Sequence, residues 1–387
     1  MFIHCLGEAS MNSRALLIIA FSFVLISASF SLPRFSSRMN LPCQSCHINP
    51  SGGGMRNTFG ANFGRDDISV KAWQEEYALE DFSTKLTNFI SYGADFRFLG
   101  FYQSKTSPDV TSSSFFPMQM DLYFNLAVSK KINLYVNPAF GPYSRLEMFA
   151  IAKVLPLNGY LKLGRFVPSH GLRYDDHTSF IRQSTPFRNY GGQQTGVEFG
   201  LNPEPITVMG AVTNGMRGDL DGGLAKAVFG KIEGHGAFGP INLMAGVSSY
   251  NDASGGQKLN LLEGYGAVTI NEQLTVLGTI EQIQGNAATM SVSSDLNQRN
   301  SLNSDLKQLA VMIEADYVLV QGFDLKFMYD FFDPNTDVKS GTAERYSGGF
   351  EFMPIGGVEV RPMYRYTKDS ILNRTITDLQ VLFHIYL

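Results

Sequence analysis

The chain has 387 residues, a formal net charge of −4 and no long basic run, which excludes nucleic acid as its partner. Only 17% of its residues are charged, against about 25% in an ordinary soluble domain. With 30 Phe, 17 Tyr and 38 Gly, the composition favours an all-β chain in which apolar and polar residues alternate, as they do in a barrel that spans a lipid bilayer.

Residues 1–31 have the pattern of a secretory signal peptide. Arg14 precedes a short apolar core, residues 15–26. Small residues follow at 27–29 and 31, and cleavage is expected near residues 28–31. A membrane anchor is the alternative, but the apolar core is shorter than the about 20 residues with which a helix crosses a bilayer. We therefore expect an exported chain.

The expected mature chain keeps two of the three cysteines, both within the motif Cys43-Gln44-Ser45-Cys46-His47. Two thiols at this spacing can add to the two vinyl groups of one haem, and the adjacent histidine then binds the iron. A redox or structural disulfide leaves His47 without a role, and a zinc site needs a second pair of ligands. The motif therefore predicts one covalent haem c, held by Cys43 and Cys46, with His47 as the metal ligand.

The predicted haem segment, residues 32–82, is too small to bury a core of its own, so we expect it to lean on a larger domain. A glycine run at residues 52–54 can let the backbone approach a flat cofactor closely. Arg56 and Arg65 can pair with haem propionates, or they are solvated charges of a linker. Residues 70–82 can form a short amphipathic helix.

The second axial ligand of the iron stays open. Met55 is favoured over Met39 as a thioether ligand, although either can simply be a packing residue, and His170 and His177 are the alternatives if the fold brings them near. The last two belong to residues 169–177, which hold two His and two Asp that can bind a divalent ion. An ordinary porin loop folded into the lumen is the favoured interpretation of this stretch.

The pattern of polar and apolar residues over residues 83–387 predicts an antiparallel transmembrane β-barrel of about 16 strands. Over residues 118–129 every even position is apolar, and most odd positions are polar. We expect the polar face to line a wet lumen, including Asp95, Arg97, Asp121 and Asn125.

Connection lengths favour a barrel over the alternative fold, a secreted array of β-sandwiches. Tight turns alternate with long connections, as in outer-membrane proteins. The long connections are expected around residues 103–115, 168–194, 213–223, 250–257, 286–305, 333–343 and 368–374. The last strand agrees, since it has one apolar face formed by Leu379, Val381, Phe383, Ile385 and Leu387.

A signal peptide, one CxxCH motif and a porin-like barrel together resemble the fused monohaem cytochrome c–porins of the outer membrane, including those of the iron-oxidising type. Only Cys43, Cys46 and His47 carry over residue by residue. The resemblance implies electron transfer across the outer membrane of a Gram-negative bacterium, between an extracellular donor or acceptor and periplasmic c-type cytochromes or other redox carriers. It places the haem segment on the periplasmic side of the barrel or in its lumen. The barrel is shorter than expected for iron-oxidising members, which leaves the donor open.

Two further functions are compatible with these features. One is a passive porin whose haem segment acts as a plug or stabiliser. The other is a haem enzyme, such as a peroxidase, with an open iron position. An electron carrier is favoured over an enzyme, with outer-membrane lipid as the surroundings of the barrel.

Overall fold

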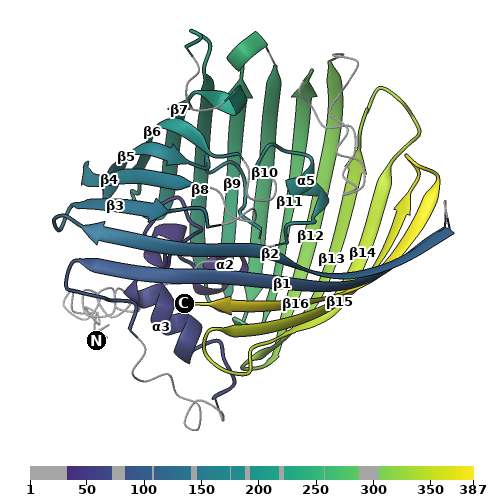
Figure 1. Ribbon diagram of the computed structural model, residues 1–387, viewed down its shortest axis with the longest axis horizontal. Helices are drawn as coiled ribbons and strands as arrows, with labels where there is room; N and C mark the ends of the chain where they lie inside the picture. Colours follow the sequence, from purple (N-terminus) through teal and green to yellow (C-terminus); the bar gives the residue numbers. More distant parts are fainter. Residues whose placement is uncertain are drawn as a thin grey trace, which may run out of the picture.

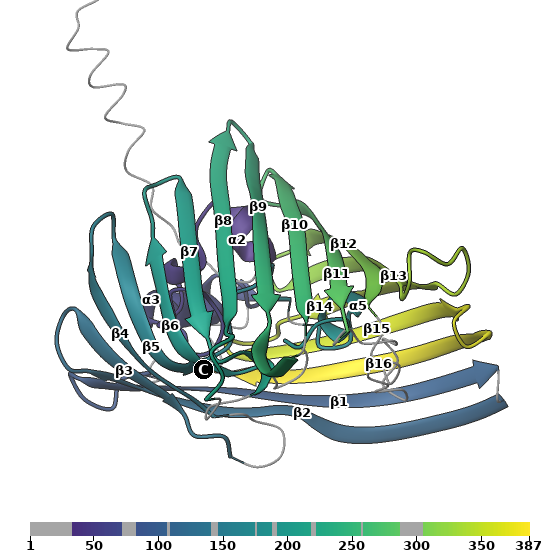
Figure 2. The ribbon, with the colours of Figure 1, turned by 90° about the horizontal axis from the view of Figure 1, so that it is seen from above.

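The computed structural model describes residues 33–71, 83–106, 109–140, 146–174, 176–187, 192–217, 222–256, 258–286 and 305–387. The expected signal peptide and all but the first two residues of the expected helix at 70–82 lie outside the described residues. Sixteen antiparallel strands close into one barrel in which neighbours in the chain pair with one another and β1 pairs with β16 (Figure 1). Figure 2 shows the same wall from above. The expected antiparallel barrel and its strand number are confirmed.

Short helices accompany the strands among the described residues. Three precede the barrel, namely α2 (Pro33–Met39), the 3-10 turn η1 (Cys43–Ser45) and α3 (Thr58–Asp66). The first half of the wall consists of β1 (Ile90–Thr106), β2 (Asp109–Ala127), β3 (Ile132–Asn137), β4 (Glu147–Leu155), β5 (Gly159–Phe166), β6 (Gln194–Leu201), β7 (Ile206–Thr213) and β8 (Ala227–Phe238). The second half consists of β9 (Ile241–Asp252), β10 (Leu259–Ile270), β11 (Leu274–Gly285), β12 (Leu306–Val320), β13 (Phe323–Asp333), β14 (Ala343–Phe352), β15 (Val358–Asp369) and β16 (Arg374–Tyr386). Connections hold α5 (Phe180–Gln183), η2 (Gly215–Arg217) and η3 (Ser254–Gly256). Within this part of the chain no helix has the length and apolar character needed to cross a membrane.

The wall of the barrel is apolar outside and charged inside. On β8 the side chains of Lys231, Glu233 and His235 are buried, whereas Val228 and Ile232 are 54% and 53% exposed. A strand of a soluble sandwich would bury its apolar face instead. The inverted pattern is that of a barrel with lipid outside and water or polar groups inside.

The four polar residues expected to face the lumen do so. Asp95, Arg97, Asp121 and Asn125 are all under 9% exposed, and the first three line the cavity described below. Their apolar neighbours point outward, as Phe98 does with 44% of its surface exposed.

Replacing Ile232 with arginine is expected to lower the free energy of unfolding by about 2–4 kcal/mol, because the side chain lies near the middle of a lipid-facing strand. Guanidinium titration of the barrel in phospholipid vesicles measures this change. Ile232→Leu is the matched control and should cost less than about 1.5 kcal/mol. Equal stability of the two variants would contradict the outward orientation of Ile232.

Short turns and longer connections alternate along the chain, and two expected long connections are wrong. Between β8 and β9 and between β12 and β13 only two residues intervene. The expected loop at 103–115 belongs instead to β1 and β2, which stay paired up to Thr106 and Asp109. This hairpin has serines and threonines on both faces, so no apolar alternation marks it as a strand pair. The connection after β15 is also short, at residues 370–373.

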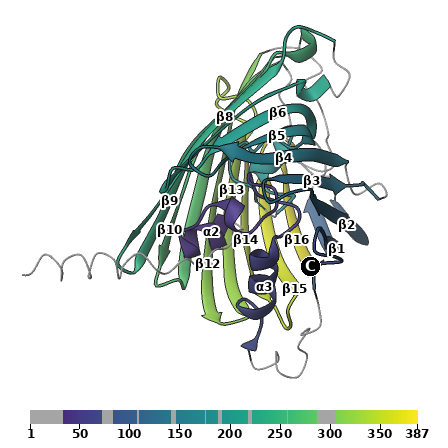
Figure 3. The ribbon, with the colours of Figure 1, turned by 90° about the vertical axis from the view of Figure 1, so that its left-hand side faces the viewer.

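The N-terminal segment lies inside the end of the barrel that carries the short turns (Figure 3). α2 packs against β9, β10 and β11. The amide of Val70 donates to the carbonyl of Met353, 3.0 Å away in the turn after β14. The side-chain amide of Asn242, at the start of β9, donates to the carbonyl of Arg38 at 2.7 Å. The segment is therefore a plug seated at one rim, which is the rim expected to face the periplasm.

Candidate haem site in the barrel lumen

The CxxCH motif forms a single tight turn. The amides of Cys46 and His47 both donate to the carbonyl of Cys43, at 3.2 Å each. Pro42 precedes the turn with φ −74°, the value that its ring imposes. In a helical turn, side chains three and four residues apart lie on the same side. The turn therefore holds Cys43, Cys46 and His47 within one turn of backbone.

A backbone carbonyl orients the imidazole of His47. Its Nδ1 lies 3.2 Å from the carbonyl oxygen of Gly54. That oxygen can only accept, so Nδ1 carries the hydrogen and Nε2 has the lone pair with which an imidazole binds a metal. Histidines that ligate metals are usually held in this manner by their other ring nitrogen. His47 thus has the tautomer that suits an iron ligand.

The glycine run beside the motif leaves space that other residues would fill. Gly52, Gly53 and Gly54 have φ values of 85°, 74° and 66°, in the left-handed region that favours glycine. A Cβ at Gly52 would stand 3.0 Å from the Cβ of Cys43 and 3.2 Å from its sulfur. The room next to the Cys43 thiol therefore depends on glycine, which fits a flat group bound at that sulfur.

A cavity of about 250 Å³ separates the motif from the lumen wall. Cys43 and His47 line it from the plug. Cys46 instead lies in an apolar cluster with Phe35 and Met353, 3% exposed, and lines a smaller adjoining cavity. Arg56 lines both cavities. A ring attached to both sulfurs would therefore lie along the boundary of these two spaces.

The thiol of Cys43 is not poised for redox exchange. Its burial, together with the nearby carboxylate of Glu233, raises the pKa of Cys43 from 9.0 to about 11. The thiol is therefore protonated at neutral pH, and thiolates rather than thiols exchange disulfides. This argues against the thioredoxin-like interpretation of the motif.

The structure separates the four candidates for the second axial ligand. Met55, the favoured one, is 1% exposed and packs in the main core cluster of the lumen. Met39 packs in the small cluster around Cys46. Among the described residues that line the cavity of His47, the candidates present are His170 and His177. The fold thus gives the two methionines packing positions and brings the two histidines to the cavity.

Of the two arginines considered for haem propionates, one is well placed. Arg56 lines the cavity, and its guanidinium stands 4.3 Å over the ring of Tyr386. Arg65 forms an exposed ion pair with its neighbour Asp66 at 2.6 Å. Arg173, which sequence reasoning did not single out, also lines the cavity. Arg173 belongs to residues 169–177, which were expected to fold inward. Its place in that stretch is the signal that could have identified it as a lining residue.

The described residues of the stretch 169–177 fold into the lumen, as expected for an inward porin loop. The hydroxyl of Ser169 donates to the carbonyl of Ser51 in the plug at 3.1 Å. Asp176 pairs with Arg365 of β15 at 2.7 Å, and Asp175 lies outside the described residues. The loop therefore narrows the lumen and touches the plug.

Buried polar contacts fix the plug to the wall from two sides. Arg34 pairs with both carboxylate oxygens of Glu351, at 2.8 Å and 2.5 Å. Lys162, fully buried on β5, donates to Asn49 at 3.1 Å and to Ser51 at 2.8 Å. Sequence reasoning missed these anchors because each joins residues more than a hundred positions apart.

No family model and no curated protein matches the chain. Solved structures do. An anion-selective porin from Comamonas acidovorans matches with a TM-score of 0.54 and 12% identity over 77% of this chain and 99% of that one. OprB from Pseudomonas putida matches with a TM-score of 0.58 and 10% identity over 84% and 100% of the two chains. The chain has the fold of outer-membrane porins. A loop-deleted OmpT of Vibrio cholerae agrees, with a TM-score of 0.55 and 11% identity over 77% and 99%. At these identities the likeness concerns the porin fold alone.

Proposed function

We propose that this chain is an electron-transfer protein of the outer membrane of a Gram-negative bacterium, carrying one haem c inside a porin-fold barrel. Cys43 and Cys46 hold the haem covalently and His47 binds its iron. Electrons pass between an extracellular donor or acceptor and periplasmic c-type cytochromes. The observation that carries the proposal is that the CxxCH turn lies in a plug inside the lumen, with Cys43 and His47 on one cavity.

The position of the plug supports transfer across the membrane. The apolar band of such a barrel is about 25 Å tall, so a haem resting on the rim would remain far from the opposite side. Here the plug enters the lumen, and its outer end contacts the short turns, as Val70 and Arg38 do. A periplasmic redox partner can approach from that rim.

The residues of this chain would hold and tune the haem, which when bound supplies a one-electron couple. His47 is held by Gly54 through Nδ1, and Gly52 leaves space beside Cys43. Arg56 lines both adjoining cavities and is placed to balance a propionate charge. Burial of Cys46, which is 3% exposed, keeps bulk water from its sulfur and lowers the local dielectric.

Transfer across a sealed membrane tests the proposal. Full-length protein with its haem is reconstituted in liposomes that enclose oxidised cytochrome c, and a reduced ferredoxin is added outside. Both partners are too large for a porin lumen, so leakage cannot reduce the enclosed cytochrome. We expect reduction inside with the native chain and none with the Cys43→Ser/Cys46→Ser variant. Haem-loaded protein that transfers no electrons would overturn the proposal.

A passive porin with a plug is the second candidate, favoured by the likeness to channel proteins such as the anion-selective porin of Comamonas acidovorans. It predicts solute conductance in planar bilayers that changes when Cys43 and Cys46 are replaced. Equal conductance of the native chain and the double variant would count against it. Electron transfer between protein partners is not expected of such a channel.

A further inference from the structure

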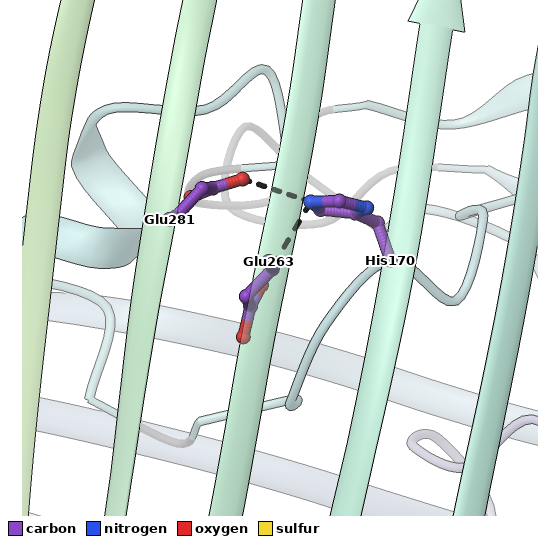
Figure 4. A group of neighbouring side chains, drawn as sticks. All are labelled: His170, Glu263 and Glu281. Carbon is purple, nitrogen blue, oxygen red and sulfur yellow. Dashed lines mark hydrogen bonds and ion pairs between the residues drawn. The ribbon is translucent and has the colours of Figure 1, made fainter.

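Three side chains that can bind a metal meet on the lumen wall (Figure 4). His170 comes from the inward loop, Glu263 from β10 and Glu281 from β11. Nε2 of His170 lies 2.8 Å from one oxygen of Glu281 and 3.8 Å from one oxygen of Glu263. One ligand atom of each residue lies within 4.8 Å of the other two, and all three residues are buried.

The two carboxylates face each other without a cation between them. Glu263 and Glu281 are direct partners in the register of β10 and β11, and like charges at such positions destabilise a sheet. Several other carboxylates of the lumen are balanced by a permanent cation, as Glu233 is by Lys231 at 3.1 Å. Within the described part of the chain, the partner of Glu263 and Glu281 in an ion pair is His170 alone.

One oxygen of Glu281 lacks a hydrogen-bond donor. Its Oε1 contacts His170, but its Oε2 is buried and has no partner among the described residues. The side chain of Glu281 has no solvent-exposed surface. A buried carboxylate oxygen without a partner is unfavourable and calls for a missing ion or group.

Groups around the cluster hold the ligands in place. Nδ1 of His170 lies 3.1 Å from the hydroxyl of Ser248, a contact that can present Nε2 to a metal. One oxygen of Glu263 accepts hydrogen bonds from the hydroxyl of Thr279 at 2.5 Å and the amide of Leu172 at 3.2 Å.

Gly171 lets the loop backbone close over the carboxylate of Glu263. Its φ is +60°, and a Cβ at this position would collide with both carboxylate oxygens of Glu263. The amide of Gly171 donates to Ser248 at 2.8 Å. The loop is thus shaped to bring His170 against the wall at this point.

We propose that His170, Glu263 and Glu281 bind a divalent first-row metal ion, of the Mn²⁺ or Zn²⁺ class, which ties the inward loop to the wall. Ligands about 2.1 Å from one ion lie about 3.0–3.4 Å apart, close to the 2.8 Å and 3.8 Å between the present atoms. One imidazole and two carboxylates suit Mn²⁺ or Zn²⁺ rather than metals that prefer thiolates. This site goes beyond the proposed haem function, and it assigns His170 to the divalent ion rather than to the second axial position of the haem iron.

Manganese titration tests the site without interference from haem absorption. Full-length protein in detergent is stripped with EDTA and desalted, and free Mn²⁺ is followed by its electron paramagnetic resonance signal. We expect one Mn²⁺ bound per chain, displaced by Zn²⁺. Glu281→Gln and Glu263→Gln should each weaken binding by roughly 10–100-fold, since each removes one ligand charge and keeps the shape.

Glu233→Gln is the matched control, because Glu233 lines the same cavity but has Lys231 as its partner. Its affinity for Mn²⁺ should equal that of the native chain. Circular dichroism of each variant verifies that the barrel is folded. Absence of Mn²⁺ binding to the native chain at about 1 mM, which is the upper end of the Kd range of weak protein sites for Ca²⁺, would overturn the proposal. Mn²⁺ binding that is unchanged in the Glu281→Gln and His170→Ala variants would also overturn the proposal.

Discussion

Serine in place of both Cys43 and Cys46 is expected to leave a folded barrel that has lost all its covalent haem. A hydroxyl does not form the thioether that a thiol makes with a haem vinyl group, so the loss is complete rather than partial. Denaturing gels stained for haem peroxidase activity measure it, after expression together with a haem-attachment system. The native chain should carry one haem and the double variant none.

His47→Ala provides the control that separates attachment from ligation. It keeps both thiols, so haem should remain covalently bound while its absorption spectrum and reduction potential change, because an axial ligand is lost. A native chain without covalent haem under these conditions would contradict the assignment of the motif. So would an unchanged spectrum in the His47→Ala variant.

Replacing Arg34 with methionine is expected to release the plug from the wall. Arg34 is 2% exposed and pairs with both oxygens of the fully buried Glu351. Removing one partner of a buried pair costs about 3–5 kcal/mol. Lys326 and Arg361 remain near Glu351, at 3.5 Å and 3.2 Å, so the lower value of about 3 kcal/mol is expected. Denaturant titration measures it, and planar-bilayer recordings should show higher conductance.

Arg65→Met is the matched control for this variant, since Arg65 belongs to the same plug. Its ion pair with Asp66 is partly exposed, at 31% and 50% for the two side chains, and exposed pairs contribute about 0–1 kcal/mol. Stability and conductance should both stay near native values. If Arg34→Met behaved like Arg65→Met, the buried pair would not be what retains the plug.

Most of the barrel follows from local patterns in the sequence. Polar and apolar residues alternate along strands such as β2 and β8, and tight turns separate one strand from the next. The end of the hairpin of β1 and β2 was predicted as a loop because residues 111–114 are Thr and Ser, which carry no apolar periodicity. Its pairing depends on the register with β16 and on the closure of the barrel, and neither is visible in a local window.

The candidate site likewise has a part that the sequence predicts and a part that depends on the fold. The CxxCH motif is local, so its three candidate haem-binding residues could be named from the sequence. Glu263 and Glu281 are placed symmetrically about the turn between β10 and β11, and hairpin arithmetic could have paired them. His170 could not be added to them, because a loop that crosses the lumen chooses its contacts by packing rather than by spacing. The packing position of Met55 could not be predicted for the same reason, because it depends on contacts between residues far apart in the sequence.

The burial of Cys46 has a consequence for the order of events during biogenesis. In the folded barrel Cys46 is 3% exposed and enclosed by Phe35 and Met353, and Met353 lies at the start of the turn before the penultimate strand. An enzyme that joins haem to this sulfur needs it open to solution. Under the proposed function the cofactor is therefore attached to the exported chain first, and the strands close around a finished cytochrome afterwards.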